Sequence, residues 1–139
     1  MSLTVIDLFS GPGGLSTGFE NAGFDIGSAV DYDESAVDTY RENHETEPLL
    51  SDIRETDTED ILENLEQNGF SSDSVVGVIG GPPCKGFSLA NMQTRSPDNP
   101  MNNLFMHFIR VVRDVNPDFF VMENVPGLLS MGKEKGEIK

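Results

Sequence analysis

The only cysteine of the chain, Cys84, lies within residues 80–88, which read Gly-Gly-Pro-Pro-Cys-Lys-Gly-Phe-Ser. Two prolines fix the backbone directly before the thiol and remove two hydrogen-bond donors, which predicts a stiff loop. Glycines on both sides allow another molecule to approach the backbone closely. A lone cysteine is most often a small buried hydrophobic residue, but packing alone does not require these neighbours. Cys84 is therefore a candidate nucleophile whose assignment depends on its partners.

A candidate partner is Glu123, which directly follows the apolar run 118–122. If this run and the run before Cys84 are neighbouring parallel strands, the thiol and the carboxylate lie at the same edge of the sheet. A carboxyl group in that position can act as an acid or as a hydrogen-bond partner of a substrate. The alternative is a loop carboxylate that pairs with a nearby arginine.

A glycine-rich loop, residues 10–14 (Ser-Gly-Pro-Gly-Gly), separates a predicted strand from a predicted helix. Backbone N–H groups and the N-terminus of the helix favour an anionic group at such a loop. The dinucleotide pattern Gly-x-Gly-x-x-Gly fails, because Ser16 stands at its third position. The sequence thus argues against a dinucleotide site, and a simple turn is the alternative to an anion-binding loop.

Acidic residues follow the next two predicted strands. Asp31 comes 18 residues after Gly13 and is placed to accept hydrogen bonds from ribose hydroxyls, with Tyr32 beside it to stack on a base. Asp33 is the better N-cap for the helix that follows. Asp52 can accept from an adenine amino group and Ile53 can cover the ring, although a surface aspartate in a turn fits the local sequence equally well.

Strands and helices alternate along the chain, which predicts an α/β fold: a doubly wound, mostly parallel sheet with helices on both faces. The predicted strands are residues 4–9, 24–30, 48–53, 75–79 and 118–122. The predicted helices are residues 15–22, 34–43, 58–68 and 103–113. The loop at residues 89–101 is long by usual standards.

Composition excludes several classes of protein. A chain of 139 residues suits one domain, and no apolar run approaches the roughly 20 residues that span a bilayer. One cysteine excludes an internal disulfide, and the absence of Cys/His clusters argues against a zinc site. No signal peptide is evident at the start of the sequence, so a cytoplasmic location is expected.

The net charge of −15 is spread unevenly. Residues 31–70 hold 14 acidic and 2 basic side chains, whereas residues 71–139 hold 7 of each. A solvated acidic face is the simplest interpretation, and adaptation to concentrated salt is a second one. The half that carries Cys84 is the only one that a nucleic acid can approach without strong repulsion.

Taken together, three motifs in this order closely resemble the cytosine-C5 DNA methyltransferases. They are Asp-Leu-Phe-Ser-Gly-Pro-Gly-Gly at 7–14, Pro-Pro-Cys-Lys-Gly-Phe-Ser at 82–88 and Glu-Asn-Val at 123–125. The resemblance implies a Rossmann-like, S-adenosylmethionine-dependent fold, DNA as the partner of the full-length protein, and a link to restriction and modification. It implies no metal and no membrane. A tRNA cytosine methyltransferase of the same superfamily, an inactive cofactor-binding module and a nicotinamide-binding domain are the alternatives.

The resemblance also implies roles for individual residues. Cys84 would be the nucleophile that adds to C6 of cytosine, and Glu123 would contact the ring nitrogen. The S-adenosylmethionine pocket would be formed by Phe9, Gly11, Gly13, Gly14, Asp31, Tyr32, Asp52, Ile53, Pro83 and Leu104. Lys85 stands where the family usually has glutamine. The family's later motifs, including the target-recognition region, are absent, so residues 1–139 are expected to be the N-terminal part of a catalytic domain.

Overall fold

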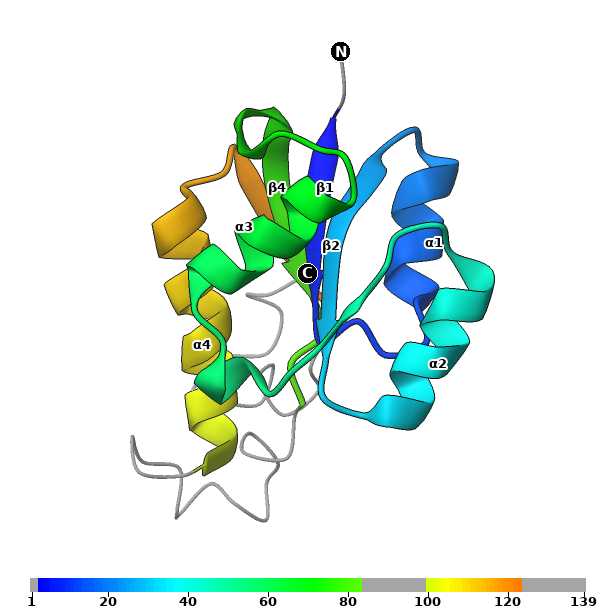
Figure 1. Ribbon diagram of the computed structural model, residues 1–139. Helices are drawn as coiled ribbons and strands as arrows, with labels where there is room; N and C mark the ends of the chain where they lie inside the picture. Colours follow the sequence, from blue (N-terminus) through cyan, green and yellow to red (C-terminus); the bar gives the residue numbers. More distant parts are fainter. Residues whose placement is uncertain (1–2, 84–99, 124–139) are drawn as a thin grey trace, which may run out of the picture.

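A computed structural model describes residues 3–83 and 100–123 of the chain, with side chains undescribed at 100–103. Five parallel strands form one sheet in the order β3-β2-β1-β4-β5 (Figure 1). The strands are β1 (Thr4–Leu8), β2 (Asp25–Asp31), β3 (Leu49–Leu50), β4 (Val75–Gly80) and β5 (Phe119–Met122). The sheet order reverses at β1, so loops following β1, β2 and β4 meet at the carboxyl ends of the strands.

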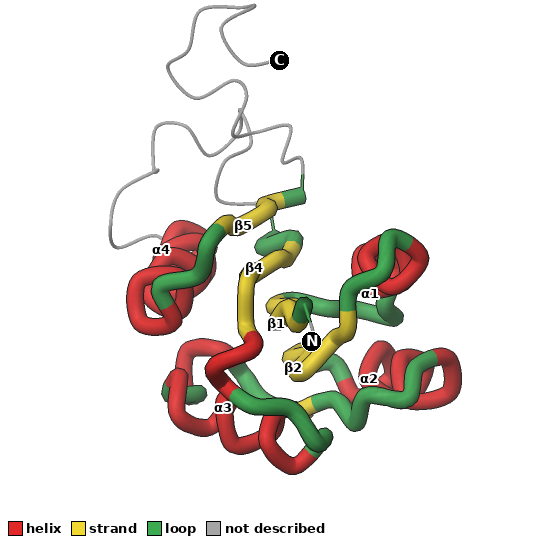
Figure 2. Tube along the Cα trace, turned by 90° about the horizontal axis from the view of Figure 1, so that it is seen from above, coloured by secondary structure: helices red, strands yellow, loops and turns green. Residues whose placement is uncertain are grey.

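Helices cover both faces of this sheet, as Figure 2 shows from above. One face carries α1 and α2, and the other carries α3 and α4. The helices are α1 (Gly14–Asn21), α2 (Glu34–Asn43), α3 (Thr58–Gln67) and α4 (Pro100–Val115), with short 3₁₀ turns η1 (Ile53–Glu55) and η2 (Ser72–Ser74). The predicted doubly wound parallel α/β fold is confirmed.

The hydrophobic core explains why β1 is central. Every residue of β1 is buried, and its side chains alternate between the two faces of the sheet. Ile6 and Leu8 pack with Phe108 of α4 and the apolar face of α3. Val5 packs toward α1 on the opposite face. Since β1 is fixed from both sides, the loop that leaves its carboxyl end starts from a rigid base.

Most predicted element boundaries are confirmed to within a few residues. Asp33 is the N-cap of α2, and its carboxylate accepts from the backbone N–H of Ser35 at 3.0 Å. The third strand is shorter than predicted, only Leu49–Leu50, because Ser51 onward turns into η1. Asp52 starts that turn by accepting from the N–H of Arg54 at 2.9 Å.

A glycine at the end of β4 is expected to be essential for stability. A Cβ on Gly80 would overlap the carbonyl oxygen of Leu8 and approach Phe108 to 3.0 Å. Gly80→Ala should therefore lower the free energy of unfolding by about 2–3 kcal/mol, measured by urea denaturation. Gly18→Ala, on α1 with nothing within 4 Å of the new Cβ, is the control and should stabilise slightly. Equal effects of the two substitutions would contradict this packing.

Within the described ranges, no helix combines the length and apolarity needed to cross a membrane. The same residues contain no group of three His, Cys, Asp or Glu side chains arranged to hold a metal ion.

Candidate functional site

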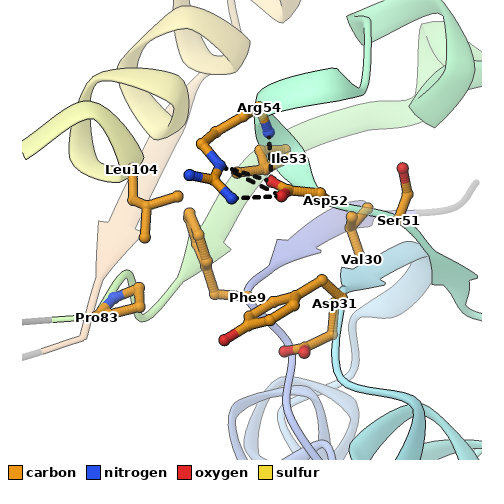
Figure 3. A pocket seen from close by; sticks show the side chains of 10 residues that line it. Phe9, Val30, Asp31, Ser51, Asp52, Ile53, Arg54, Pro83 and Leu104 are labelled. Atoms are coloured by element: carbon orange, nitrogen blue, oxygen red, sulfur yellow. Dashed lines mark hydrogen bonds and ion pairs between the residues drawn. The ribbon is translucent and has the colours of Figure 1, made fainter. Parts of the chain in front are cut away.

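A pocket lies at the carboxyl ends of the strands, where the segments after β1, β2, β3 and β4 meet α4. Figure 3 shows its side chains converging from these separate elements. The lining residues are Phe9, Val30, Asp31, Tyr32, Ser51, Asp52, Ile53, Arg54, Pro83 and Leu104. Seven of the predicted cofactor residues, distant from one another in sequence, are thus in one pocket. Val30, Ser51 and Arg54 were not predicted.

A second hollow adjoins the glycine loop. It is lined by Asp7, Phe9, Ser10, Gly11, Pro12, Gly14, Leu15, Gly81 and Glu123. Phe9 lines both hollows, so they are neighbours around one side chain. Phe9 has φ of 55°, in the left-handed region that non-glycine residues rarely adopt. The chain therefore turns sharply as soon as β1 ends, and the ring is placed between the two hollows.

Gly13 lines neither hollow, but its lack of a side chain shapes the loop. Its φ is 104°, and a Cβ there would overlap the ring of His44 and approach Tyr40 to 2.8 Å. These two rings stack on one another with centroids 4.2 Å apart. His44 Nδ1 is 2.8 Å from a carboxylate oxygen of Glu20 on α1. The end of α2 thus supports the glycine loop from behind.

Asp31 joins the end of β2 to the glycine loop. Its Oδ2 accepts from the backbone N–H of Gly11 at 2.8 Å, and its Oδ1 accepts from the N–H of Asp33 at 2.9 Å. The neighbouring Tyr32 is 71% exposed, so its ring is free to pack on a ligand. A carboxylate held by two N–H groups is oriented before any ligand arrives.

The far wall of the pocket is the turn from Ser51 to Thr56. Arg54 forms an ion pair with Asp52, with Nη2 2.7 Å from Oδ2 (Figure 3). Hydrogen bonding from Arg54 lowers the pKa of Asp52 below its ordinary value. Thr56 closes the turn, since its hydroxyl donates to the carbonyl of Asp52 at 2.6 Å. The turn is a preformed wall rather than a loose loop.

Glu123 lies at the end of β5, beside the end of β4. The two strands are paired with Gly80 opposite Met122, and the N–H of Glu123 donates to the carbonyl of Gly80 at 2.8 Å. A Cβ on Gly81 would overlap the Glu123 carboxylate, so that carboxylate lies directly over the start of the loop that leads to Cys84. Cys84 itself lies outside the described residues, whereas Pro83, one residue before it, lines the first pocket.

Asp7 is a buried carboxyl group that sequence reasoning passed over. Its Oδ2 accepts from the Ser16 hydroxyl at 2.6 Å, and that hydroxyl is 2.9 Å from the hydroxyl of Tyr40. Its Oδ1 has no hydrogen-bond partner among the described residues. Burial, and then the negative charges of Glu123 and Asp31, raise the pKa of Asp7 from 3.8 to about 7. The carboxyl group of Asp7 therefore keeps its proton at pH values well above those at which an ordinary aspartate ionises.

Comparison with solved structures defines the class of protein. The chain superposes on a candidate DNA modification methyltransferase from an Escherichia coli prophage with a TM-score of 0.73 and 41% identity, over 92% of this chain and 33% of that one. It superposes on the Dnmt2 methyltransferase of S. pombe with a TM-score of 0.68 over 95% of this chain and 37% of that one. At 22% identity, the second likeness shows the fold alone. The fold is the Rossmann-like fold of methyltransferases.

The chain belongs to the C-5 cytosine-specific DNA methylase family, whose model matches residues 3–138. It is 44% identical to the type II methyltransferase M1.HphI of Haemophilus parahaemolyticus over 99% of this chain. It is 43% identical to M.AquIA of Picosynechococcus over 97% of this chain. The chain spans 37% of the length of the first relative and 53% of the second. The family resemblance inferred from the three motifs is confirmed.

Proposed function

We propose that the chain is the N-terminal, S-adenosylmethionine-binding part of a DNA cytosine-C5 methyltransferase catalytic domain and carries the nucleophile Cys84. Membership of the family supports a DNA substrate. The first pocket, which seven of the predicted cofactor residues line, supports a cofactor that contains a nucleoside. The observation that carries the proposal is the convergence of Tyr32, Asp31 and Asp52 on one pocket. Their types match a ring-stacking surface, a ribose acceptor and an adenine acceptor.

The donor set of the pocket fits this cofactor. Asp31, already oriented by Gly11, would accept from the ribose hydroxyls, and Tyr32 would cover the adenine. Asp52 would accept from the adenine amino group while Ile53, Leu104 and Pro83 supply apolar contact. The hollow at Gly11 and Gly14 would hold the methionine end, with Gly13 needed for the bend of the loop.

The reaction requires that an unreactive ring carbon be made nucleophilic. Cys84 Sγ, as thiolate, would form a bond to C6 of a cytosine that has left the duplex. Glu123 would hold or donate a proton at the ring nitrogen N3, so that the electron pair of the C5–C6 double bond becomes available at C5. S-adenosylmethionine, when bound, supplies the methyl group that C5 takes up. Loss of the C5 proton then re-forms the double bond and expels the Cys84 thiolate.

A direct assay tests the proposal. The protein translated from its whole reading frame is incubated with S-adenosylmethionine carrying a labelled methyl group, with duplex DNA and, separately, with tRNA. Label in the cytosines of DNA is expected. Label in tRNA alone would overturn the DNA assignment, and cofactor binding without transfer to either would favour a non-catalytic module. We expect no transfer by residues 1–139 alone, since the relatives have a longer chain.

Asp31 is expected to be decisive for cofactor affinity. Asp31→Ala removes the proposed ribose acceptor and the bond that holds Gly11, so the dissociation constant for S-adenosylmethionine should rise at least about tenfold in calorimetric titration. Asp33→Asn is the matched control, because it removes a charge two residues away and keeps an N-cap side chain. Unchanged binding by Asp31→Ala would contradict the ribose assignment.

A further inference from the structure

Arg110 of α4 is bound to the turn that forms the far wall of the first pocket. Its Nη2 donates to the carbonyl oxygens of Ile53 at 3.0 Å and of Thr56 at 2.8 Å. Ile53 lines the pocket, and Thr56 closes the turn. The arginine and these carbonyls are more than 50 residues apart in sequence, so the contact fixes two separate elements against each other.

The carbonyl of Ile53 already accepts from the N–H of Thr56, but at 3.3 Å, and Arg110 gives it a second, shorter donor at 3.0 Å. Buried carbonyls are costly when poorly paired, so the added donor stabilises the turn. Hydrogen bonds from a charged guanidinium to two carbonyls are stronger than neutral ones. The turn is therefore held by an ion pair between two of its own residues, Asp52 and Arg54, and by hydrogen bonds from Arg110 of α4.

The arginine is itself oriented by a neighbour on its own helix. Its Nε donates to Nδ1 of His107 at 3.1 Å. Burial first, and the charge of Arg110 next, lower the pKa of His107 below its ordinary value. The imidazole is therefore neutral at physiological pH, which leaves Nδ1 free to accept. Arg110 thus has one guanidinium nitrogen fixed on α4 and another on the turn.

We propose that Arg110 is a positioning residue for cofactor binding, which sets the spacing between the pocket wall at Asp52–Arg54 and the wall that α4 supplies through Leu104. Both walls line the same pocket, and Arg110 touches neither the pocket nor the reacting groups. Its effect is therefore on the affinity for the adenine end of the cofactor and not on the chemical step. This proposal rests on the proposed binding of S-adenosylmethionine in that pocket.

Arg110→Met tests the proposal in the protein translated from its whole reading frame. The KM for S-adenosylmethionine should rise about tenfold, the factor for one lost hydrogen bond to a charged group, with kcat at saturating cofactor unchanged. Arg110→Lys, which keeps the charge and one donor to the turn, should restore part of the affinity. Arg113→Met is the matched control, because Arg113 is on the same helix and 75% exposed, and it should leave KM unchanged.

A second measurement keeps the proposal testable without any ligand. The amides of Arg54, Glu55 and Thr56 donate within the turn, so their hydrogen exchange reports whether the turn is held. Faster exchange at these amides in both Arg110 variants, with exchange in β1 unchanged, is expected. Normal exchange, or a fall in kcat with KM unchanged, would overturn the proposal. Absence of cofactor binding by the wild-type protein would overturn the proposed function instead, while the exchange result still decides the role of Arg110 in the turn.

Discussion

Cys84→Ala is expected to abolish methyl transfer to DNA. Without the thiolate, no bond forms at C6 and the C5 carbon of cytosine stays too poor a nucleophile to accept a methyl group. Loss of a covalent nucleophile should reduce kcat by at least about a thousandfold, measured by incorporation of labelled methyl groups. The substitution changes none of the described residues that line the first pocket, so S-adenosylmethionine should bind to the variant with unchanged affinity.

The same variant isolates the covalent step from cofactor binding and DNA binding. A DNA duplex with 5-fluorocytosine at the target position should trap the wild-type protein, because fluorine cannot leave as the C5 proton does and the bond to Cys84 persists. The trapped complex should survive a denaturing gel, and Cys84→Ala should form none. Residual methylation by Cys84→Ala near the wild-type rate would refute the nucleophile assignment.

Asp7→Asn is expected to change how stability depends on pH. The folded protein holds the Asp7 proton with a pKa of about 7, against 3.8 for an ordinary aspartate, mainly because the carboxyl is buried. Folding therefore takes up a proton between these pH values, and the contribution of Asp7 to the free energy of unfolding falls as the pH rises through this range. The difference between the two pKa values corresponds to a loss of about 4 kcal/mol in the free energy of unfolding between low pH and a pH above 7.

Urea denaturation at pH 4, 5.5, 7 and 8.5 measures this effect. The difference in unfolding free energy between Asp7→Asn and the wild type should shift in favour of the variant as the pH rises, because the asparagine never has to ionise. Glu63→Gln removes an acidic group from an exposed position on α3 and should leave the pH profile unchanged. Parallel profiles for Asp7→Asn and the wild type would show that the buried carboxyl titrates normally.

Local signals in the sequence predicted the fold and part of the pocket lining, whereas Phe9, Pro83 and Leu104 were predicted from the family resemblance. The strand before the glycine loop, the N-cap at Asp33 and the acids at Asp31 and Asp52 each stand at the end of an element that its own residues specify. Parallel strand ends meet at one edge, so their side chains gather there without further information. Cys84 stays a prediction, because it lies outside the described residues.

The contacts that the sequence did not reveal are those between distant segments. Arg110 and Ile53 are 57 residues apart, and nothing near either residue marks the other. The hydroxyl of Ser16 on α1 donates to Asp7 and lies close to the hydroxyl of Tyr40 on α2. Nothing in the sequence next to Asp7 indicates these partners. The ring of His44 likewise occupies the space that a side chain at position 13 would need. The sequence around His44 gives no sign of this contact.

The acidic segment of the chain and the segment with balanced charge include strands on opposite sides of β1 in the sheet. Residues 31–70, with 14 acidic and 2 basic side chains, run from the end of β2 through α2, β3 and α3, whereas β4, α4 and β5 belong to the balanced segment. Both α2 and α3 pack against β2. For the proposed DNA substrate, we expect repulsion by the acidic segment to favour an approach of the duplex from the flank with β4 and β5. Added salt should weaken that preference and so change the association rate more than the dissociation rate.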